Sequence, residues 1–195
     1  MKRYHRRVTV HDPLALRYDC GAVWLNLLAT RGRSFSADPV ERLTGVDRLA
    51  EWLAHSELSP VRAPGPEDLE LTREVRETLR PLALATVDGV PPPPAAADRL
   101  VTLLAGQDAP VRLIADERLR LAPPATAREA LARITRQAID QLTGADRHVL
   151  KVCPEDDCRG VFIDPPGRRR WCPSPACASR GRVRALRARR AAHEQ

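Results

Sequence analysis

Apolar residues recur at intervals of three and four along much of the chain, the spacing of one face of an α-helix. The segments that show this pattern lie at 23–29, 67–84, 95–104 and 126–143. In the last of them, Thr126 and Glu129 form a capping box that predicts where the helix begins, and Gly144 predicts its end. The pattern therefore predicts a body built mainly of helices.

Pro81 and Asp47 predict further features of the helical body. Pro81 is expected to bend or end the helix that begins near Glu67, because proline removes a backbone donor and clashes with the preceding turn. Asp47 is a suitable N-cap for an additional helix that carries Leu49, Trp52 and Leu53 on one face.

A different pattern, the alternation of apolar and polar residues, predicts a small amount of β-structure. It occurs at 111–115 and 118–122, which we interpret as a half-buried hairpin turning at Asp116-Glu117. A short strand is also predicted at 14–19. The chain is thus expected to be an α+β protein with a mainly helical N-terminal domain and a small antiparallel sheet.

Four of the five cysteines form two pairs, Cys153–Cys158 and Cys172–Cys177, with four residues inside each pair and thirteen between the pairs. Four thiolates suit the tetrahedral coordination of a closed structural zinc site, and the spacer is long enough for a small hairpin. Disulfides or unrelated thiols are the alternatives, but disulfides need an oxidising compartment and nothing in the sequence indicates export. One structural zinc per chain is therefore predicted, and Cys20 is interpreted as a buried core residue.

The segment around these cysteines has too few large apolar groups to fold without help. Before the C-terminal helix they are Val152, Val161, Phe162, Ile163 and Trp171. A bound metal would supply the missing stability. We expect a chelator to unfold this segment and to spare the N-terminal helices. The connection at 146–152 has no Gly/Ser character, so the segment is expected to be docked on the body.

The cysteine segment resembles the CGNR zinc finger, whose pattern combines Cys-x4-Cys, Phe-x-Asp, Arg-Arg-Trp-Cys, Cys-Gly-Asn-Arg and a basic helix. The matching stretches are Phe162-Ile163-Asp164, Arg169-Arg170-Trp171-Cys172 and Cys177-Ala178-Ser179-Arg180. Ala178-Ser179 replaces the Gly-Asn of the name-giving motif, and Pro165-Pro166 replaces the usual Ser or Thr after the aspartate. The four expected metal ligands are intact.

The N-terminal part resembles the ABATE domain that usually precedes this finger in bacterial proteins and is labelled a stress-induced transcription regulator. The stretch 23–27, with Arg31 after it, stands where that domain has Leu-Asp-Phe-x-Asn-Thr. Asn26 is retained, and we interpret it as a buried amide that bonds nearby backbone. The resemblance implies a regulatory or dimerising domain at 1–148 and a zinc finger at 149–195, with a homodimer possible.

The positive charge of the protein is confined to its C-terminal part. The formal net charge is +7, and the last 49 residues carry 12 basic and 5 acidic side chains, so the preceding residues are balanced. An anionic partner is expected, and DNA fits best. The candidate DNA-binding residues are Arg169, Arg170, Arg180, Arg182, Arg184 and Arg187.

The C-terminal helix is expected to run from about 177 to 192. Arg180, Arg184 and Arg187 share one face of it, and the neighbouring Val183 and Leu186 are expected to pack on Phe162 or Trp171. Two alternatives to DNA binding stay open. The basic finger could be a protein-interaction module for acidic partners, or a structural zinc knuckle with a solvated tail.

No catalytic constellation is found in the sequence. The five histidines are scattered, and neither a Gly-rich phosphate loop nor a Gly-x-Ser-x-Gly nucleophile motif is present. We therefore predict no enzyme activity. No apolar run approaches the roughly 20 residues that span a bilayer, and no signal peptide follows Met1. The protein is expected to be cytoplasmic.

Overall fold

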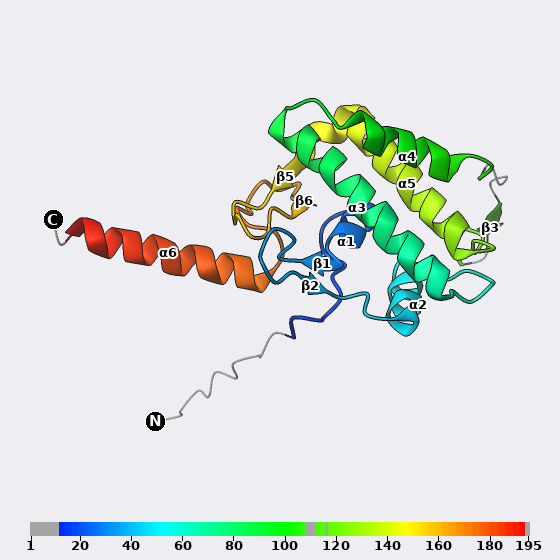
Figure 1. The fold of residues 1–195 in the computed structure, drawn as a ribbon, viewed down its shortest axis with the longest axis horizontal. Helices are drawn as coiled ribbons and strands as arrows, with labels where there is room; N and C mark the ends of the chain where they lie inside the picture. The colour runs from blue at the N-terminus through cyan, green and yellow to red at the C-terminus, as the bar shows by residue number, and fades with distance from the viewer. Residues whose placement is uncertain (1–11, 108–111, 116, 194–195) are drawn as a thin grey trace, which may run out of the picture.

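Helix α3 (Pro66–Asp88) is the element around which the body is built. In the computed structural model, which describes residues 12–107, 112–115 and 117–193, α3 packs against α5 (Ala127–Thr143), α4 (Pro94–Leu104) and α1 (Val23–Leu28). Figure 1 shows these helices side by side, with α2 (Val46–His55) near the start of α3. Buried residues of all five helices form one hydrophobic core that includes Trp24, Trp52 and Leu131.

The capping and proline chemistry of α3 explains its length. Asp68 Oδ2 accepts a hydrogen bond from the Gly65 backbone at 2.9 Å, and Gly89 ends the helix in the left-handed conformation at φ +67°. Pro81 lies inside the helix and does not end it, so of the two expected effects, a bend or an end, the end is excluded. The residues around it, Leu79 and Leu82, are buried, and we attribute the continuation to this packing, which outweighs the missing hydrogen bond.

The other helix predictions are largely confirmed. Helix α5 begins as its capping box requires: Thr126 accepts from the Glu129 backbone at 3.2 Å, and Glu129 Oε2 accepts from the Ala125 backbone at 2.7 Å. It ends at Gly144. Helix α2 begins one residue before Asp47, which therefore lies in the first turn and not at the N-cap.

The described residues form three two-stranded antiparallel sheets. They pair β1 (Arg31–Gly32) with β2 (Val40–Glu41), β3 (Leu113–Ala115) with β4 (Leu119–Leu121), and β5 (Leu150–Val152) with β6 (Val161–Ile163). A 3-10 helix at Ala145–Val149 connects α5 to β5. The α+β class predicted from the sequence is thus confirmed, although the sheet is divided into three pieces.

Two strand predictions need correction. The β3–β4 hairpin forms at the predicted place (Val111 and Asp116 lie outside the described residues), but it is not half-buried. Leu113, Leu119 and Leu121 are all more than half exposed, because no other element of the described residues covers that face. Residues 14–19 form no strand. The backbone carbonyl of Leu14 instead accepts a hydrogen bond from the side chain of Arg48 at 2.8 Å.

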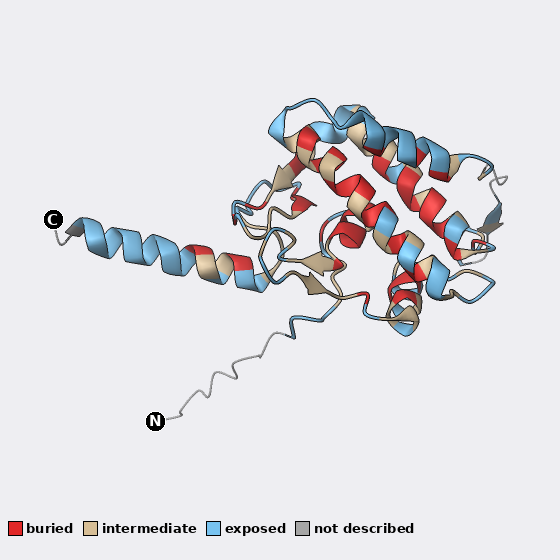
Figure 2. Cartoon of the chain, in the orientation of Figure 1, coloured by how far each residue is buried: buried red, intermediate tan, exposed pale blue. Residues whose placement is uncertain are grey.

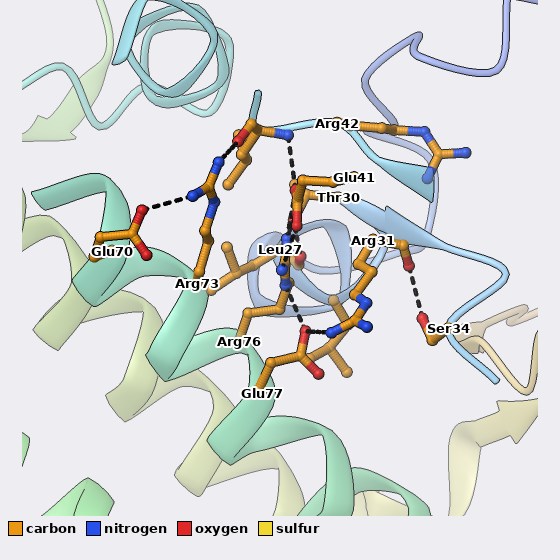
Figure 3. Close-up of polar contacts among 12 residues, drawn as sticks. Leu27, Thr30, Arg31, Ser34, Glu41, Arg42, Glu70, Arg73, Arg76 and Glu77 are labelled. Carbon is orange, nitrogen blue, oxygen red and sulfur yellow. Dashed lines mark hydrogen bonds and ion pairs between the residues drawn. The ribbon is translucent and has the colours of Figure 1, made fainter. Parts of the chain in front are cut away.

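A buried arginine attaches the β1–β2 hairpin to α3 (Figure 3). Arg76 is 2 % exposed and donates to both carboxylate oxygens of Glu41, at 2.8 and 2.6 Å, to Thr30 at 3.0 Å and to Glu77 at 2.7 Å. Burial disfavours the charged form of the Glu41 carboxylate, but the hydrogen bonds from Arg76 hold the pKa of Glu41 below its ordinary value. The hairpin is therefore fixed on α3 by a satisfied ionic network.

The β5–β6 hairpin is part of the same core as the helices. Leu150, Val161 and Phe162 belong to the main hydrophobic cluster, and Phe162 is completely buried. The Ile163 backbone also donates to the Cys20 carbonyl at 2.9 Å. The expectation that the cysteine segment is docked is confirmed. The division at residue 148 stays a prediction, because the core continues across it.

Candidate metal centre and basic helix

The four paired cysteines converge at the outer end of the β5–β6 hairpin. Cys153, Cys158, Cys172 and Cys177 place their Sγ atoms within 4.8 Å of one another, and the Cys158 and Cys172 Sγ atoms are 3.8 Å apart. Tetrahedral coordination with Zn–S distances of about 2.3 Å requires sulfur atoms about 3.8 Å apart. The donor set therefore fits one zinc ion, bound by all four predicted ligands.

The backbone around the first cysteine pair is folded into a tight turn. The backbone groups of Cys158 and Arg159 both donate to the Glu155 carbonyl at 2.9 Å, and Cys153 donates to the Gly160 carbonyl at 3.0 Å. A side chain at Gly160 would approach the Cys158 sulfur, since a Cβ there would lie 3.4 Å from it. The turn therefore holds the two thiols ready for one ion.

Hydrogen bonds among the four clustered thiols shift their pKa values in opposite directions. Bonds with Cys158, and then with Cys172 and Cys177, lower the pKa of Cys153, whereas the bond with Cys153 is the largest cause that raises the pKa of Cys158 and of Cys172. By contrast, burial raises the pKa of Cys20 to about 12. Cys20 is 5 % exposed and lies in the core, as predicted. Its backbone donates to Asn26 Oδ1 at 2.9 Å, which confirms the structural interpretation of Asn26.

Glu155, between the first two cysteines, is a functional residue that sequence reasoning missed. It is 2 % exposed and receives three partners: the Trp171 indole at 3.1 Å, the Arg180 guanidinium at 3.6 Å, and Arg184 through a short hydrogen bond. A buried carboxylate is stable when it is paired in this way. Glu155 thus ties the first cysteine turn to helix α6 (Pro175–His193).

Gly181 allows the same helix to approach Trp171 closely. A Cβ at position 181 would lie 2.4 Å from the indole carbon Cε2, which is far below any normal contact. Glycine within a helix costs roughly 1 kcal/mol relative to alanine, so its presence there requires a packing reason. The available sequence signal was this isolated glycine inside the helical pattern.

Two further contacts attach the finger to the N-terminal body. Asp157 pairs with Arg180 of α6 at 3.0 Å and with Arg33 of the β1–β2 loop at 3.5 Å. Arg159 pairs with Asp88, at the end of α3, at 2.7 Å. The direction of α6 is therefore fixed by the zinc-binding turns and, through Asp157, by the β1–β2 loop.

Most of helix α6 leaves the body (Figures 1 and 2). Cys177 and Gly181 are buried, but every residue from Arg182 to Ala192 is exposed. Val183 and Leu186 are 46 % and 51 % exposed, so the prediction that they pack on Phe162 or Trp171 was wrong. Phe162 is already buried in the main core, and Trp171 already has Gly181 against its indole and the Arg170 guanidinium over its ring, 5.3 Å from the centroid.

The structure places the predicted DNA-binding arginines in three settings. Arg180 and Arg184 already bind carboxylates of the finger. Arg182 and Arg187 are exposed on α6, with no acidic side chain of the described residues in ion-pair distance. Arg169 and Arg170 are exposed in the loop after β6, not on the hairpin, and the Arg169 backbone donates to Asp164 at 2.5 Å.

Comparison with protein-family models gives two matches. Residues 150–190 match the CGNR zinc finger, so the cysteine cluster and the basic helix define the chain as a zinc-finger protein. Residues 21–145 match ABATE, described as "Putative stress-induced transcription regulator". Since this match covers more than half of the sequence, the chain belongs to the ABATE family. A search of curated proteins found no match.

We expect purified protein to contain one zinc per chain without added metal, as measured by elemental analysis. Cys172→Ser removes one of the four thiolates and should abolish retention of the ion during dialysis. Cys20→Ser is the matched control and should keep full zinc content, because Cys20 lies in the core and not among the ligands. Full zinc retention by the Cys172 variant would contradict the ligand assignment.

Proposed function

We propose that the protein is a transcription regulator that binds DNA through helix α6 and the adjoining loop of its zinc finger. The observation that carries the proposal is the exposed helix itself. From Pro175 to His193 it contains six arginines and no acidic residue. Phosphates are bound by cations held on a rigid support, and the zinc-binding turns provide that support. The family description supports the same function.

The arginines of the finger fall into two groups according to their contacts. We assign Arg180 and Arg184 to positioning, because each already pairs with a carboxylate of the first cysteine turn. We assign phosphate binding to exposed arginines that flank that anchored region: Arg169, Arg170, Arg182, Arg187 and Arg189. Neutralising an arginine of the second group should weaken binding to every DNA sequence.

A protein-interaction module is the second candidate function. The exposed part of α6, from Arg182 to Ala192, supports it, because a short helical segment without tertiary packing is marginal alone and gains stability from whatever it binds. An acidic protein could be such a partner. Catalysis has little support in the described residues. A cavity of about 350 Å³ between α3, α4 and α5 is lined by apolar side chains, Arg128 and the Arg99–Glu74 ion pair. The hydroxyls of Thr78 and Thr102 also line it, but each donates to a backbone carbonyl and not to a general base.

No helix of the described residues has the length and apolar character needed to cross a bilayer. Dimerisation remains a proposal. Regulators with a small reading head commonly bind palindromic sites as dimers, which would double the number of phosphate contacts.

The salt dependence of DNA binding tests the phosphate assignment. Five contacts per chain predict a slope of log K against log salt of about −4.5, and Arg187→Gln should reduce its magnitude by about 0.9 per chain. Arg118→Gln is the matched control, because Arg118 is equally charged and 62 % exposed but lies on the β3–β4 hairpin. It should leave the slope unchanged. Fluorescence anisotropy between 50 and 200 mM salt measures both variants.

Equal changes of the slope in the two variants would show that DNA binding depends only on net charge, and would contradict the assignment of binding to α6. The interaction module would be favoured by two results together. The protein would bind no DNA at about 150 mM salt, and it would capture a protein partner that the Arg187→Gln variant does not capture.

A further inference from the structure

We infer that one face of α6, formed by Val183, Leu186 and Arg190, enters the major groove of duplex DNA and contacts the base edges. This inference rests on the proposed function, and it goes further by separating the residues that read sequence from those that bind phosphate. Arg190 is thereby the residue that would determine specificity. One side of α6 is anchored to the finger, and the opposite side is free.

The anchored side of α6 is defined by its contacts with the finger. Cys177 is a zinc ligand, Gly181 lies against Trp171, and Arg180 and Arg184 bind Glu155. At about 100° per residue, these four positions lie within an arc of about 100°. In the first turns of α6, from Cys177 to Arg184, this arc faces the finger, so a large ligand meets least obstruction on the opposite side.

The opposite side carries an apolar pair and an arginine. Val183, Leu186 and Arg190 fall within an arc of about 60°, and Leu186 points about 170° away from the centre of the anchored arc. All three are exposed, and Val183 and Leu186 contact no element of the core. An exposed apolar pair on an otherwise basic helix favours a binding surface over a purely solvated one.

Arginines border this face on both sides. Arg187 lies on one edge, about 40° from Val183, and Arg182 and Arg189 lie on the other, about 40° and 60° from Leu186. A helix with its side chains is about 10–12 Å wide and the major groove about 12 Å wide, so the two edges would meet the two phosphate backbones. The face between them would meet the floor of the groove.

The chemistry of that face matches what the floor of the groove presents. Thymine offers a methyl group to apolar side chains, and guanine offers two acceptors to an arginine fork. The exposed segment from Arg182 to Ala192 is about 16 Å long, enough to follow roughly five base pairs. A flat acidic protein would contact one arginine edge and leave the other without a partner. The two-edged arrangement therefore favours duplex DNA.

The test is selection from a pool of randomised 25-base-pair duplexes, using the zinc-loaded full chain. Arg190→Ala and Leu186→Ala are compared with Arg189→Ala, an edge control on the same turn of helix as Arg190. All three positions are exposed, and none contacts the core. Circular dichroism should therefore show the same fold in each variant.

We expect the wild type to select a motif. Arg190→Ala should lower discrimination at one base pair by roughly 5- to 150-fold, the range for loss of one bidentate base contact. Leu186→Ala should relax a neighbouring position. Arg189→Ala should weaken binding to selected and unrelated duplexes by the same factor, with no change of motif.

Three results would overturn the inference, and they separate it from the proposed function. If Arg190→Ala behaves like Arg189→Ala, the reading face is wrong while DNA binding stands. If the wild type binds duplexes but selects no motif, α6 reads no bases and the proposed function again survives. If the wild type binds no duplex DNA, both fail together.

Discussion

Removing zinc from the intact chain is expected to destabilise the N-terminal helices as well as the finger. The physical reason is the shared core. Leu150, Val161 and Phe162 pack among the helices, and Arg159 binds Asp88 at the end of α3. Metal binding contributes about 10–16 kcal/mol to the folding of isolated zinc fingers, so much of the hairpin's order depends on the ion. If loss of the ion lowers the unfolding free energy of the helical body by only about 4 kcal/mol, the melting temperature of the helices should fall by roughly 8–16 °C.

Thermal unfolding followed by the helical circular dichroism signal measures this effect, before and after chelation and again after zinc is restored. Cys153→Ser should reproduce the chelated behaviour, and Cys20→Ser with its zinc intact should not. An unchanged helical transition after chelation would instead mean that the finger unfolds alone. That result would agree with the expectation from the sequence, which was that a chelator unfolds the finger and spares the N-terminal helices.

Phe162→Ala is expected to cost about 3–5 kcal/mol of the unfolding free energy of the whole protein, even with saturating zinc. Phe162 is completely buried and belongs to the core cluster that also contains residues of α1 and α3. Truncating it removes apolar burial and leaves a cavity between the β5–β6 hairpin and these helices. Urea denaturation with zinc held constant gives the difference.

Leu186→Ala is the matched control, because it also removes a large apolar side chain from the C-terminal part. Leu186 is 51 % exposed on the free part of α6, so its truncation should change stability by less than about 0.5 kcal/mol. Equal effects of the two substitutions would contradict the shared core.

The sequence predicted features that depend on neighbouring residues or on strict coordination chemistry. Helix α5 was recognised from Thr126, Glu129 and Gly144, whose hydrogen bonds are local. The metal ligands were recognised because tetrahedral zinc restricts both the type and the spacing of its donors. The capping residues of α5 bond to groups a few residues away in the chain, and the four cysteines are restricted by the coordination of one ion.

The failures concern contacts that periodicity does not encode. The alternation at 113–121 predicts a hairpin, but it cannot tell whether another element covers the apolar face, and none among the described residues does. Pro81 was expected to interrupt α3, yet packing on both sides keeps the helix continuous. Glu155 and Gly181 were missed because their roles depend on Trp171, Arg180 and Arg184, which only the folded finger brings to them.

The most direct test of DNA binding by α6 is a genome-wide crosslinking map in cells. It would compare the wild type with a variant carrying Arg182→Gln and Arg187→Gln, both on the exposed part of the helix. The account predicts discrete promoter peaks for the wild type and their loss in the variant, with zinc content and melting temperature unchanged. A flat map for the wild type, or peaks that persist in the variant, would contradict it.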